Sequence, residues 1–309
     1  MKIAVMGTGG VGGVFGARLA EAGCDVSFIA RGKHLAAIKE NGLKVVSEEV
    51  KDCLLKPCKA SDNASEIGPV DVVLFSVKLW DTESAAKQIE PMVGESTAII
   101  SLQNGILKDE ILRKYYGKER VVGGVSYVAA TISAPGVVTQ KGVVQKLVFG
   151  EYGPKPASKR LEELRDACLK GGVDAEIPEN IEKAIWEKFV FLVAMSAVTA
   201  ATRQTIGPVR SNEGTRRLLV DVMTEAIAVA KARGIVLDDG LIERRLAYWD
   251  GLSPDVTSSM QHDLQQGNRL ELPWLSGTVV ELGKELGVPT PVNRVLVDLL
   301  MPFVDGSKS

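Results

Sequence analysis

Continuous apolar runs alternate with segments of helical spacing over the first half of the chain. The runs at residues 3–6, 69–77 and 98–102 are bounded by glycine or polar residues, which is typical of strands buried on both faces of a parallel sheet. Their alternation with helical segments predicts an α/β fold with a doubly wound parallel sheet. Further strands are expected at residues 26–30, 43–50, 121–128, 137–140, 144–149 and 173–177.

The pattern changes near residue 178, beyond which the apolar residues have mostly helical spacing. The first stretch, Ile181–Thr202, is long and rich in apolar residues. We therefore expect an N-terminal sheet domain of residues 1–178 and a C-terminal all-helical domain of residues 179–309. Further helices are expected at residues 215–233, 241–249, 256–266, 274–286 and 292–303.

The first strand runs directly into a glycine-rich turn that opens a helix. The turn reads Gly7-Thr8-Gly9-Gly10-Val11-Gly12. In a strand–turn–helix unit of this kind, Gly7 permits the tight turn, Gly9 lets the backbone approach a pyrophosphate, and Gly12 lets the helix pack close to the strand. The free N–H groups of the helix N-terminus favour phosphate. The turn predicts a Rossmann-like dinucleotide-binding domain.

The residues after the second strand indicate which dinucleotide is bound. NAD-binding domains usually carry Asp or Glu there, which holds the ribose 2′-OH. This chain instead reads Arg31-Gly32-Lys33-His34, which offers cations and no carboxylate. Cations suit the additional phosphate of NADP, so we expect NADP rather than NAD. A solvated basic loop is the alternative interpretation.

Composition and charge exclude several classes of protein. The net charge of −2 over 309 residues gives no indication of a nucleic-acid partner or of an anionic membrane surface. No run approaches the roughly 18 uninterrupted apolar residues of a spanning helix, and the apolar start is too short for a signal peptide. We expect a cytoplasmic protein that does not bind membranes.

The cysteines and histidines do not form a metal-binding pattern. Cys24, Cys53, Cys58 and Cys168 contain no CxxC pair, and the chain has only 2 histidines. We expect no metal site and reduced thiols.

Two polar residues follow buried strands of the predicted sheet. Lys78 follows the run at residues 69–77, and Asn104 follows the run at residues 98–102. Ligands of such sheets bind beyond the carboxyl ends of the strands. The glycine turn, Lys78 and Asn104 are therefore expected on one edge of the sheet.

Reduction of a carbonyl by a nicotinamide requires a proton donor for the developing alkoxide. His34 lies beside the expected adenosine end, and His262 lies in the helical domain, so both are interpreted as solvated or structural. Lys188 is the only cation within the apolar residues 184–201, and desolvated lysines shift their pKa readily. The alternative is that Lys188 extends from a core helix to water.

These motifs together resemble the ketopantoate reductase (2-dehydropantoate 2-reductase) family of the 6-phosphogluconate dehydrogenase-like proteins. The resemblance spans nearly the whole chain. Beyond the glycine turn and Arg31, its carriers are Ser76-Val77-Lys78, Gln103-Asn104-Gly105, Trp186-Glu187-Lys188, Ser258-Ser259-Met260 with Asp263, and Arg269-Leu270-Glu271.

The resemblance implies a role for each matching residue of the cofactor site. Arg31 would hold the 2′-phosphate of NADPH, and Lys78 and Asn104 would line the nicotinamide side. Ala130 would contact the cofactor through its backbone. Glu271 would reach the cofactor and help to set the geometry of hydride transfer.

The resemblance also implies the substrate site. Lys188 would be the general acid, while Asn104 and Ser259 would bind the substrate. The family usually has asparagine four and eight residues after the lysine, where this chain has Leu192 and Ser196. Leucine cannot donate a hydrogen bond, and serine is shorter, so Ser196 would offer the substrate only a hydroxyl.

The implied reaction is the NADPH-dependent reduction of a 2-oxo acid to a 2-hydroxy acid. The default is 2-dehydropantoate (ketopantoate) to pantoate in pantothenate biosynthesis, and the changed positions leave another branched or aromatic 2-oxo acid open. A β-hydroxyacid dehydrogenase is a further alternative, against which Leu192 argues. A non-catalytic NADP-binding sensor is another, against which the retained Lys188 argues. A homodimer is plausible, but buried helices explain the apolar second half equally well.

Overall fold

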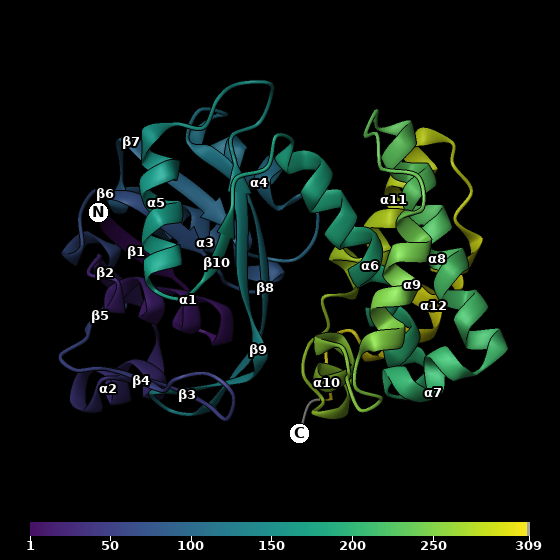
Figure 1. Cartoon of the computed structure of the whole chain (residues 1–309), viewed down its shortest axis with the longest axis horizontal. Coiled ribbons are helices and arrows are strands. Elements are labelled where there is room, and N and C mark those ends of the chain that lie inside the picture. The colour runs from purple at the N-terminus through teal and green to yellow at the C-terminus, as the bar shows by residue number, and fades with distance from the viewer. Residues whose placement is uncertain (308–309) are drawn as a thin grey trace. The chain divides into compact units, whose positions relative to one another are not determined.

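The computed structural model describes residues 1–307. The chain divides into two compact units, Met1–Ala184 and Ile185–Ser309, which are described separately below (Figure 1). The first unit extends beyond the change of pattern near residue 178 into the first turn of a long helix.

The first unit is organised around one sheet. Its strands are β1 (Lys2–Met6), β2 (Asp25–Ile29), β3 (Leu43–Ser47), β4 (Cys53–Leu55), β5 (Lys59–Ser61), β6 (Val70–Phe75), β7 (Val93–Ser101), β8 (Val121–Ala134), β9 (Val137–Gly150) and β10 (Asp174–Glu176). Within residues 1–307, these 10 strands follow the order β4-β3-β9-β8-β7-β6-β1-β2-β5, with β10 beside β9. The strands from β5 through β8 pair in parallel, which confirms the α/β fold class.

Two details of the predicted sheet were wrong. The sheet is mixed, because β8 pairs with β9 and β3 pairs with β4 in antiparallel fashion. The two strands expected at residues 137–140 and 144–149 are one strand, β9. The register of β9 against β8 shifts between Val128 and Ala129, which marks a β-bulge in β9. The bulge includes Gly142, with φ +71°, so the residues that were expected to end the strand only interrupt its pairing.

Helices cover both faces of the sheet. They are α1 (Gly10–Glu21), α2 (Gly32–Asn41), α3 (Thr82–Gln88), α4 (Lys108–Tyr116) and α5 (Lys159–Lys170), with the short 3₁₀ helices η1 (Ala64–Glu66), η2 (Leu79–Asp81) and η3 (Glu90–Met92). Successive strand residues point to opposite faces: Ile3 and Val5 pack with α1 and α5, whereas Ala4 and Met6 pack with α3 and α4.

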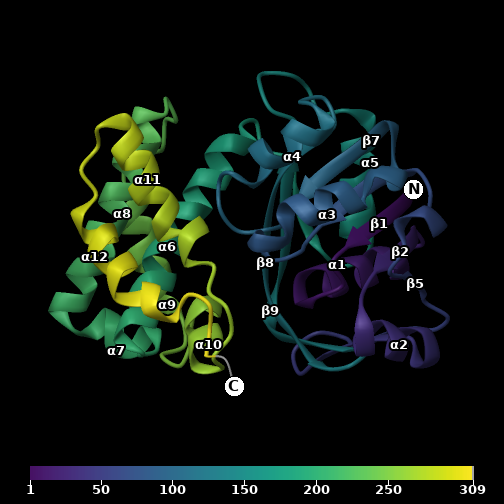
Figure 2. The same cartoon turned by 180° about the vertical axis from the view of Figure 1, so that it is seen from behind.

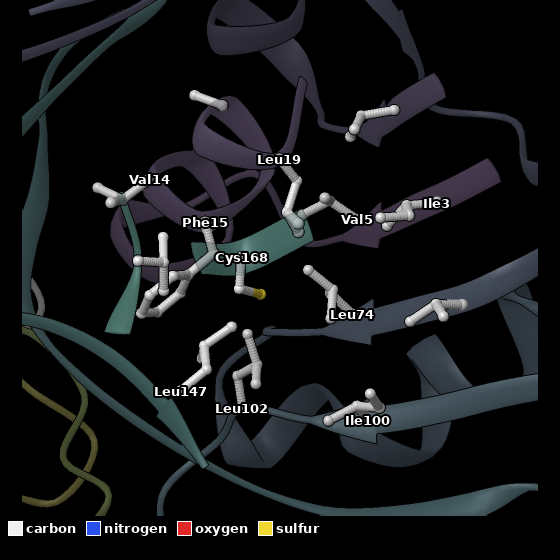
Figure 3. Packing of buried hydrophobic residues seen from close by; sticks show 14 of the residues in the cluster. Ile3, Val5, Val14, Phe15, Leu19, Leu74, Ile100, Leu102, Leu147 and Cys168 are labelled. Atoms are coloured by element: carbon white, nitrogen blue, oxygen red, sulfur yellow. The ribbon is translucent and has the colours of Figure 1, made fainter. Parts of the chain in front are cut away.

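Figure 3 shows the first of these two cores. Phe15 and Leu19 of α1 and Cys168 of α5 lie over Val5 and Leu74 of the central strands. Burying a side chain such as Phe15 or Leu19 contributes about 1.5–3 kcal/mol to stability. This packing fixes the start of α1, and with it the glycine turn.

Between residues 185 and 307 every regular element is helical, which confirms the prediction of a helical C-terminal region. The helices are α6 (Ile181–Thr202), which begins in the first unit, α7 (Ile206–Ser211), α8 (Glu213–Ala232), α9 (Leu241–Gly251), α10 (Ser259–Gln265), α11 (Ser276–Leu286) and α12 (Pro291–Leu300), with the 3₁₀ helices η4 (Leu272–Trp274) and η5 (Met301–Phe303). Helix α8 is central and contacts α7, α9, α11 and α12 (Figure 2).

Helix α6 is long and apolar enough to cross a membrane by length and composition alone. No membrane-spanning segment was expected because the chain has no long uninterrupted apolar run. Polar residues such as Lys188 and Ser196 interrupt the apolar sequence of α6. Within the described residues, 67% of its most apolar window is buried inside the protein. Burial in a protein core is therefore sufficient to explain its composition.

Candidate active site

The glycine turn is held in a conformation that larger residues would disturb. Gly7 has φ +96°, in the region that favours glycine, and a Cβ on it would lie 2.9 Å from Val77 Cγ1. A Cβ on Gly12 would lie 2.3 Å from both the carbonyl oxygen of Gly7 and Ser76 Oγ. Because neither glycine carries a side chain, α1 can begin close to the ends of β1 and β6.

Gly9 differs from the glycines on either side. It is the N-cap of the 12-residue helix α1. Apart from Gly9 and its two chain neighbours, no heavy atom of the described residues lies within 4 Å of the place of a Cβ. The first N–H groups of a helix have no partner within that helix, and the helix dipole makes this end positive. Open space thus borders an end of α1 that is suited to a phosphate group.

Side chains from neighbouring strands fix the turn. The backbone N–H and the hydroxyl of the buried Thr8 donate to the carbonyl of Ile29, at 3.0 and 2.9 Å. Ser76 Oγ donates to the carbonyl of Gly7 at 2.8 Å. The carbonyl oxygen of Ala130, on β8, would lie 2.1 Å from a Cβ on Gly10. The structure therefore places the Ala130 backbone against the start of α1, next to the half-buried Val11.

Arg31 and Lys33 lie just beyond the end of β2. Arg31 is exposed and is the N-cap of α2, and Lys33 is exposed in the first turn of that helix. His34 accepts a hydrogen bond at Nδ1 from the N–H of Gly136, at 3.0 Å. Burial lowers the pKa of the His34 imidazole, an effect that the Thr8 backbone partly offsets. His34 is therefore a neutral link between α2 and the β8–β9 turn.

Lys78 and Asn104 follow adjacent strands of the sheet. Met6 pairs with Phe75, and Phe75 pairs with Ser101 in parallel register, so β1, β6 and β7 end at the same edge. The structure thus brings the glycine turn, Lys78 and Asn104 to one edge. Lys78 is exposed with its Nζ 5.6 Å from the centroid of the Trp80 ring, and Asn104 is half-buried.

Lys188 lies on α6, in the helical unit. It is half-buried and lies among the apolar side chains of that helix. The neighbouring Glu187 forms an ion pair with Arg245 of α9 at 3.6 Å, and Arg245 lies 5.9 Å from the centroid of Phe191. These contacts next to Lys188 are thus between side chains, whereas those of the glycine turn involve the backbone.

The two positions that depart from the family pattern have different environments. Leu192, one turn after Lys188, is half-buried. Ser196 is 0% exposed, and its Oγ has no hydrogen-bond partner within residues 1–307. A buried hydroxyl without a partner is energetically unfavourable, which makes Ser196 a polar group of the helical unit with unused bonding capacity.

Ser259 is the first residue of α10 and is exposed, and Ser258 before it anchors the helix. Ser258 Oγ accepts from the N–H of Gln261 at 3.1 Å and lies 2.8 Å from Thr199 Oγ1 of α6. Sequence reasoning selected Ser259 and missed the supporting pair. The available signal was a serine three residues before a glutamine, as in a capping box.

Glu271 also lies in the helical unit, where it is 9% exposed and precedes η4. The candidate residues therefore fall into two groups. Lys188, Ser196, Ser259 and Glu271 belong to the helical unit, whereas the candidate cofactor residues with lower numbers belong to the sheet unit.

Thiols and metal ligands add no further chemistry within the described residues. No group of three or more His, Cys, Asp or Glu side chains that could hold a metal ion occurs among residues 1–307. Burial raises the pKa of the Cys53 and Cys168 thiols to about 12, so neither is a reactive thiolate at neutral pH.

Comparison with known families covers almost the whole chain. The family model described as "Ketopantoate reductase PanE/ApbA" matches residues 3–154, and the model described as "Ketopantoate reductase PanE/ApbA C terminal" matches residues 180–303. The two matches correspond to the parts of the chain that form the sheet and the helical unit.

Individual relatives match over the same length. A protein of Archaeoglobus fulgidus named 2-dehydropantoate 2-reductase is 33% identical, with 99% of this chain and 98% of the relative covered. The solved PanE/ApbA family ketopantoate reductase from Ralstonia eutropha JMP134 is 35% identical with a TM-score of 0.89, and 98% of both chains is covered. The solved 2-dehydropantoate 2-reductase from Geobacter metallireducens GS-15 is 32% identical with a TM-score of 0.91, covering 98% of this chain and 99% of that one.

Proposed function

Because the chain belongs to the ketopantoate reductase family and is an oxidoreductase of that family, we propose that it reduces a 2-oxo acid to a 2-hydroxy acid with NADPH. The proposed reaction is ketopantoate to pantoate, in pantothenate biosynthesis in the cytoplasm. The observation that carries the proposal is the single edge of the sheet on which the open glycine turn, Lys78 and Asn104 meet.

The residues of the sheet unit suit a dinucleotide with an additional phosphate. The pyrophosphate would lie over Gly9, at the N-terminus of α1, where a side chain would occupy the open space. The 2′-phosphate would contact Arg31 and Lys33, both exposed at the start of α2. Lys78 and the Ala130 backbone would contact the cofactor nearer to the nicotinamide.

Bound NADPH would supply the hydride to carbon 2 of the oxo acid. As that carbon accepts the hydride, the carbonyl oxygen gains negative charge, and the ammonium group of Lys188 donates a proton to it. The products are the 2-hydroxy acid and a neutral Lys188, which water reprotonates. General acid catalysis of this kind contributes about 10²–10⁴-fold to a rate.

Three further side chains would orient the reactants. Asn104 and Ser259 would hydrogen-bond the 2-oxo acid, which holds the carbonyl near the proton donor. Glu271, almost fully buried beside η4, would hold the nicotinamide side of the cofactor in the geometry of hydride transfer.

The α6 residues after Lys188 support a second candidate substrate. Leu192 is half-buried and apolar, and Ser196 is fully buried. Neither presents an amide, so the substrate would lose two hydrogen bonds that an asparagine-containing site provides. Such a site favours a more apolar substrate, for example another branched or aromatic 2-oxo acid.

Steady-state kinetics with NADPH and a panel of 2-oxo acids test the proposal. If ketopantoate is the substrate, its kcat/KM exceeds that of the other acids by about 100-fold or more, as a site that hydrogen-bonds its substrate achieves. If another acid is preferred, Leu192→Asn should shift preference towards ketopantoate. Leu218→Asn, at a half-buried position of α8, is the matched control and should not shift it. Binding of NADPH without turnover of any acid would contradict the proposed reaction and favour a sensor.

A further inference from the structure

A lysine of the sheet unit is completely enclosed by protein. Lys108 is the first residue of α4, and its side chain is 1% exposed. Its Nζ donates to the carbonyl oxygens of Ser101 and Gly124, at 2.6 and 2.7 Å. Burial of an ammonium group is unfavourable unless the group is paired and hydrogen-bonded. The burial of Lys108 therefore depends on these specific partners.

Adjacent side chains balance the charge of Lys108. Asp109 Oδ1 lies 3.7 Å from Lys108 Nζ, and Asp109 Oδ2 accepts a hydrogen bond from the Tyr152 hydroxyl at 2.6 Å. The Arg113 guanidinium lies 3.7 Å from the centroid of the Tyr152 ring. Burial lowers the pKa of Lys108, and the charge of Asp109 opposes that change. Carbonyl and carboxylate oxygens thus surround the buried Lys108 nitrogen and satisfy donors that apolar side chains could not.

The two carbonyls that Lys108 contacts belong to neighbouring strands. Ser101 is the last residue of β7, and Gly124 lies near the start of β8. These strands pair in parallel at Ile99 and Ile100, just before Ser101. A Cβ on Gly124 would lie 2.6 Å from the Ser101 carbonyl oxygen, so the two backbones approach closely. The Lys108 ammonium bridges them where β7 ends.

The same contact closes the loop that carries Asn104. The loop runs from residue 102 to residue 107, and the bond between Lys108 and Ser101 joins its two ends. Two other bonds fix the residues before Asn104: Ser126 Oγ donates to the Leu102 carbonyl at 3.0 Å, and Gln103 Nε2 donates to Thr82 Oγ1 at 2.9 Å. Lys108 fixes the residue that ends this loop to the sheet, on the other side of Asn104.

We propose that Lys108 is a positioning residue for Asn104, and that its bonds to Ser101 and Gly124 hold the loop in the conformation that reduction requires. This inference rests on the proposed function, because Asn104 is assigned there to the nicotinamide and the 2-oxo acid. Lys108 itself contacts backbone oxygens and Asp109, so it acts through the loop rather than on the reactants.

Lys108→Met tests the proposal because methionine fills a similar space without donating a hydrogen bond. We expect kcat to fall by about 10–100-fold, since a displacement of about 1 Å at a reacting group has effects of this size. The dissociation constant of NADPH should change by less than about 3-fold, because most cofactor contacts lie elsewhere. The matched control is Lys146→Met, at a lysine of β9 that is 33% exposed and paired with Glu176 at 2.9 Å; it should retain wild-type kcat.

A double-mutant cycle distinguishes positioning from a general structural role. In an Asn104→Ala background, Lys108→Met should lower kcat by less than about 3-fold, because the residue through which it acts is already gone. Equal losses in both backgrounds would overturn the proposal, as would an unchanged kcat. If the single variant fails to fold, Lys108→Met/Asp109→Asn is used in its place, because it also removes the buried negative charge of Asp109 that would lose its neighbouring lysine.

Hydrogen exchange gives a readout that does not depend on the reaction. In Lys108→Met, the amides of residues 102–107 should exchange at least about tenfold faster, while those of β1 keep their wild-type rates. Unchanged exchange in the loop would overturn the proposal even if kcat fell. If the wild-type protein turned over no 2-oxo acid, the proposed function would fail, and the exchange result would still decide whether Lys108 holds the loop.

Discussion

The sheet unit and the helical unit carry their candidate functional groups in different ways. In the sheet unit the backbone defines the glycine turn, because Gly10 and Gly12 lie where a Cβ would collide with backbone or side-chain atoms. In the helical unit the candidates are single side chains, such as Lys188 and Ser259, on otherwise apolar or exposed helix surfaces. At the glycine turn, the backbone conformation excludes most residue types. In the helical unit, only a few functional side chains are required, and the other helix positions can vary.

This difference suggests a division of labour between the two units. The sheet unit would determine how tightly NADPH binds, and the helical unit would supply the proton and recognise the 2-oxo acid. Substitutions in the two units should therefore change different kinetic quantities.

The largest effect is expected from the helical unit. Lys188→Ala should lower kcat by about 10²–10⁴-fold, because it removes the proposed general acid. The dissociation constant of NADPH, measured by fluorescence titration, should stay within about 3-fold of wild type. Lys231→Ala, at an exposed lysine of α8, is the control and should leave kcat unchanged. Loss of NADPH binding in Lys188→Ala would show that the two functions are not separable.

Two adjacent glycines of the sheet unit, Gly9 and Gly10, should affect cofactor binding and stability differently. Gly9→Ala places a methyl group in open space, so the melting temperature should hold while NADPH binding weakens by about tenfold or more. Gly10→Ala places a methyl group against the Ala130 carbonyl, so it should destabilise the fold by about 1–3 kcal/mol. Calorimetry and NADPH titration of both variants check this. Normal NADPH affinity in Gly9→Ala would contradict the position assigned to the pyrophosphate.

A smaller effect is expected at the end of β2. Arg31→Ala should weaken NADPH binding by about tenfold, near the lower limit for a hydrogen bond to a charged group, because Arg31 is exposed. NADH binding should change by less than about 2-fold, since NADH lacks the 2′-phosphate. Lys39→Ala, at an exposed position of the same helix, serves as the control. If Arg31→Ala weakened the binding of NADPH and NADH equally, Arg31 would not account for a preference for NADP.

The smallest effect concerns the link between α2 and the β8–β9 turn. Burial lowers the pKa of His34 below the ordinary histidine value of 6.5, so the unfolded chain takes up this proton first as the pH falls. The His34 contribution to the free energy of unfolding is therefore complete above pH 6.5 and is lost as the pH falls towards the folded pKa.

His34→Asn keeps an acceptor for the Gly136 N–H but does not titrate. Between about pH 7 and about pH 5, where histidine titrates, the melting temperature of the wild type should fall more than that of this variant. The exposed His262→Asn variant should follow the wild type. If the melting temperatures of wild type and His34→Asn fell equally with pH, His34 would not contribute the expected pH-dependent stability.

The same difference between the units explains what could be predicted from the sequence. The central strands were predictable because runs such as residues 72–75 are buried on both faces and contain only apolar residues. The glycine turn was predictable because its geometry restricts residue type. The bulge at Gly142 was not, because a glycine that ends a strand and a glycine that bends one have the same local sequence.

The helical unit was harder to interpret. The short helix α7 was missed because its six residues include both Gly207 and Pro208, which usually indicate a loop. The contact between Thr199 and Ser258 joins residues 59 positions apart, and no local pattern specifies it. Likewise, the buried Lys108 resembles an ordinary charged residue at a helix start until its partners on β7 and β8 are known.

The proposed reaction is tested most directly by the oxidation of NADPH by the purified protein with ketopantoate and related 2-oxo acids. The loss of NADPH absorbance is followed together with formation of the 2-hydroxy acid, and NADH is assayed in parallel. One molecule of 2-hydroxy acid is expected for each NADPH consumed, with NADH used less efficiently. Tight NADPH binding without consumption in the presence of every 2-oxo acid would contradict the proposed reaction.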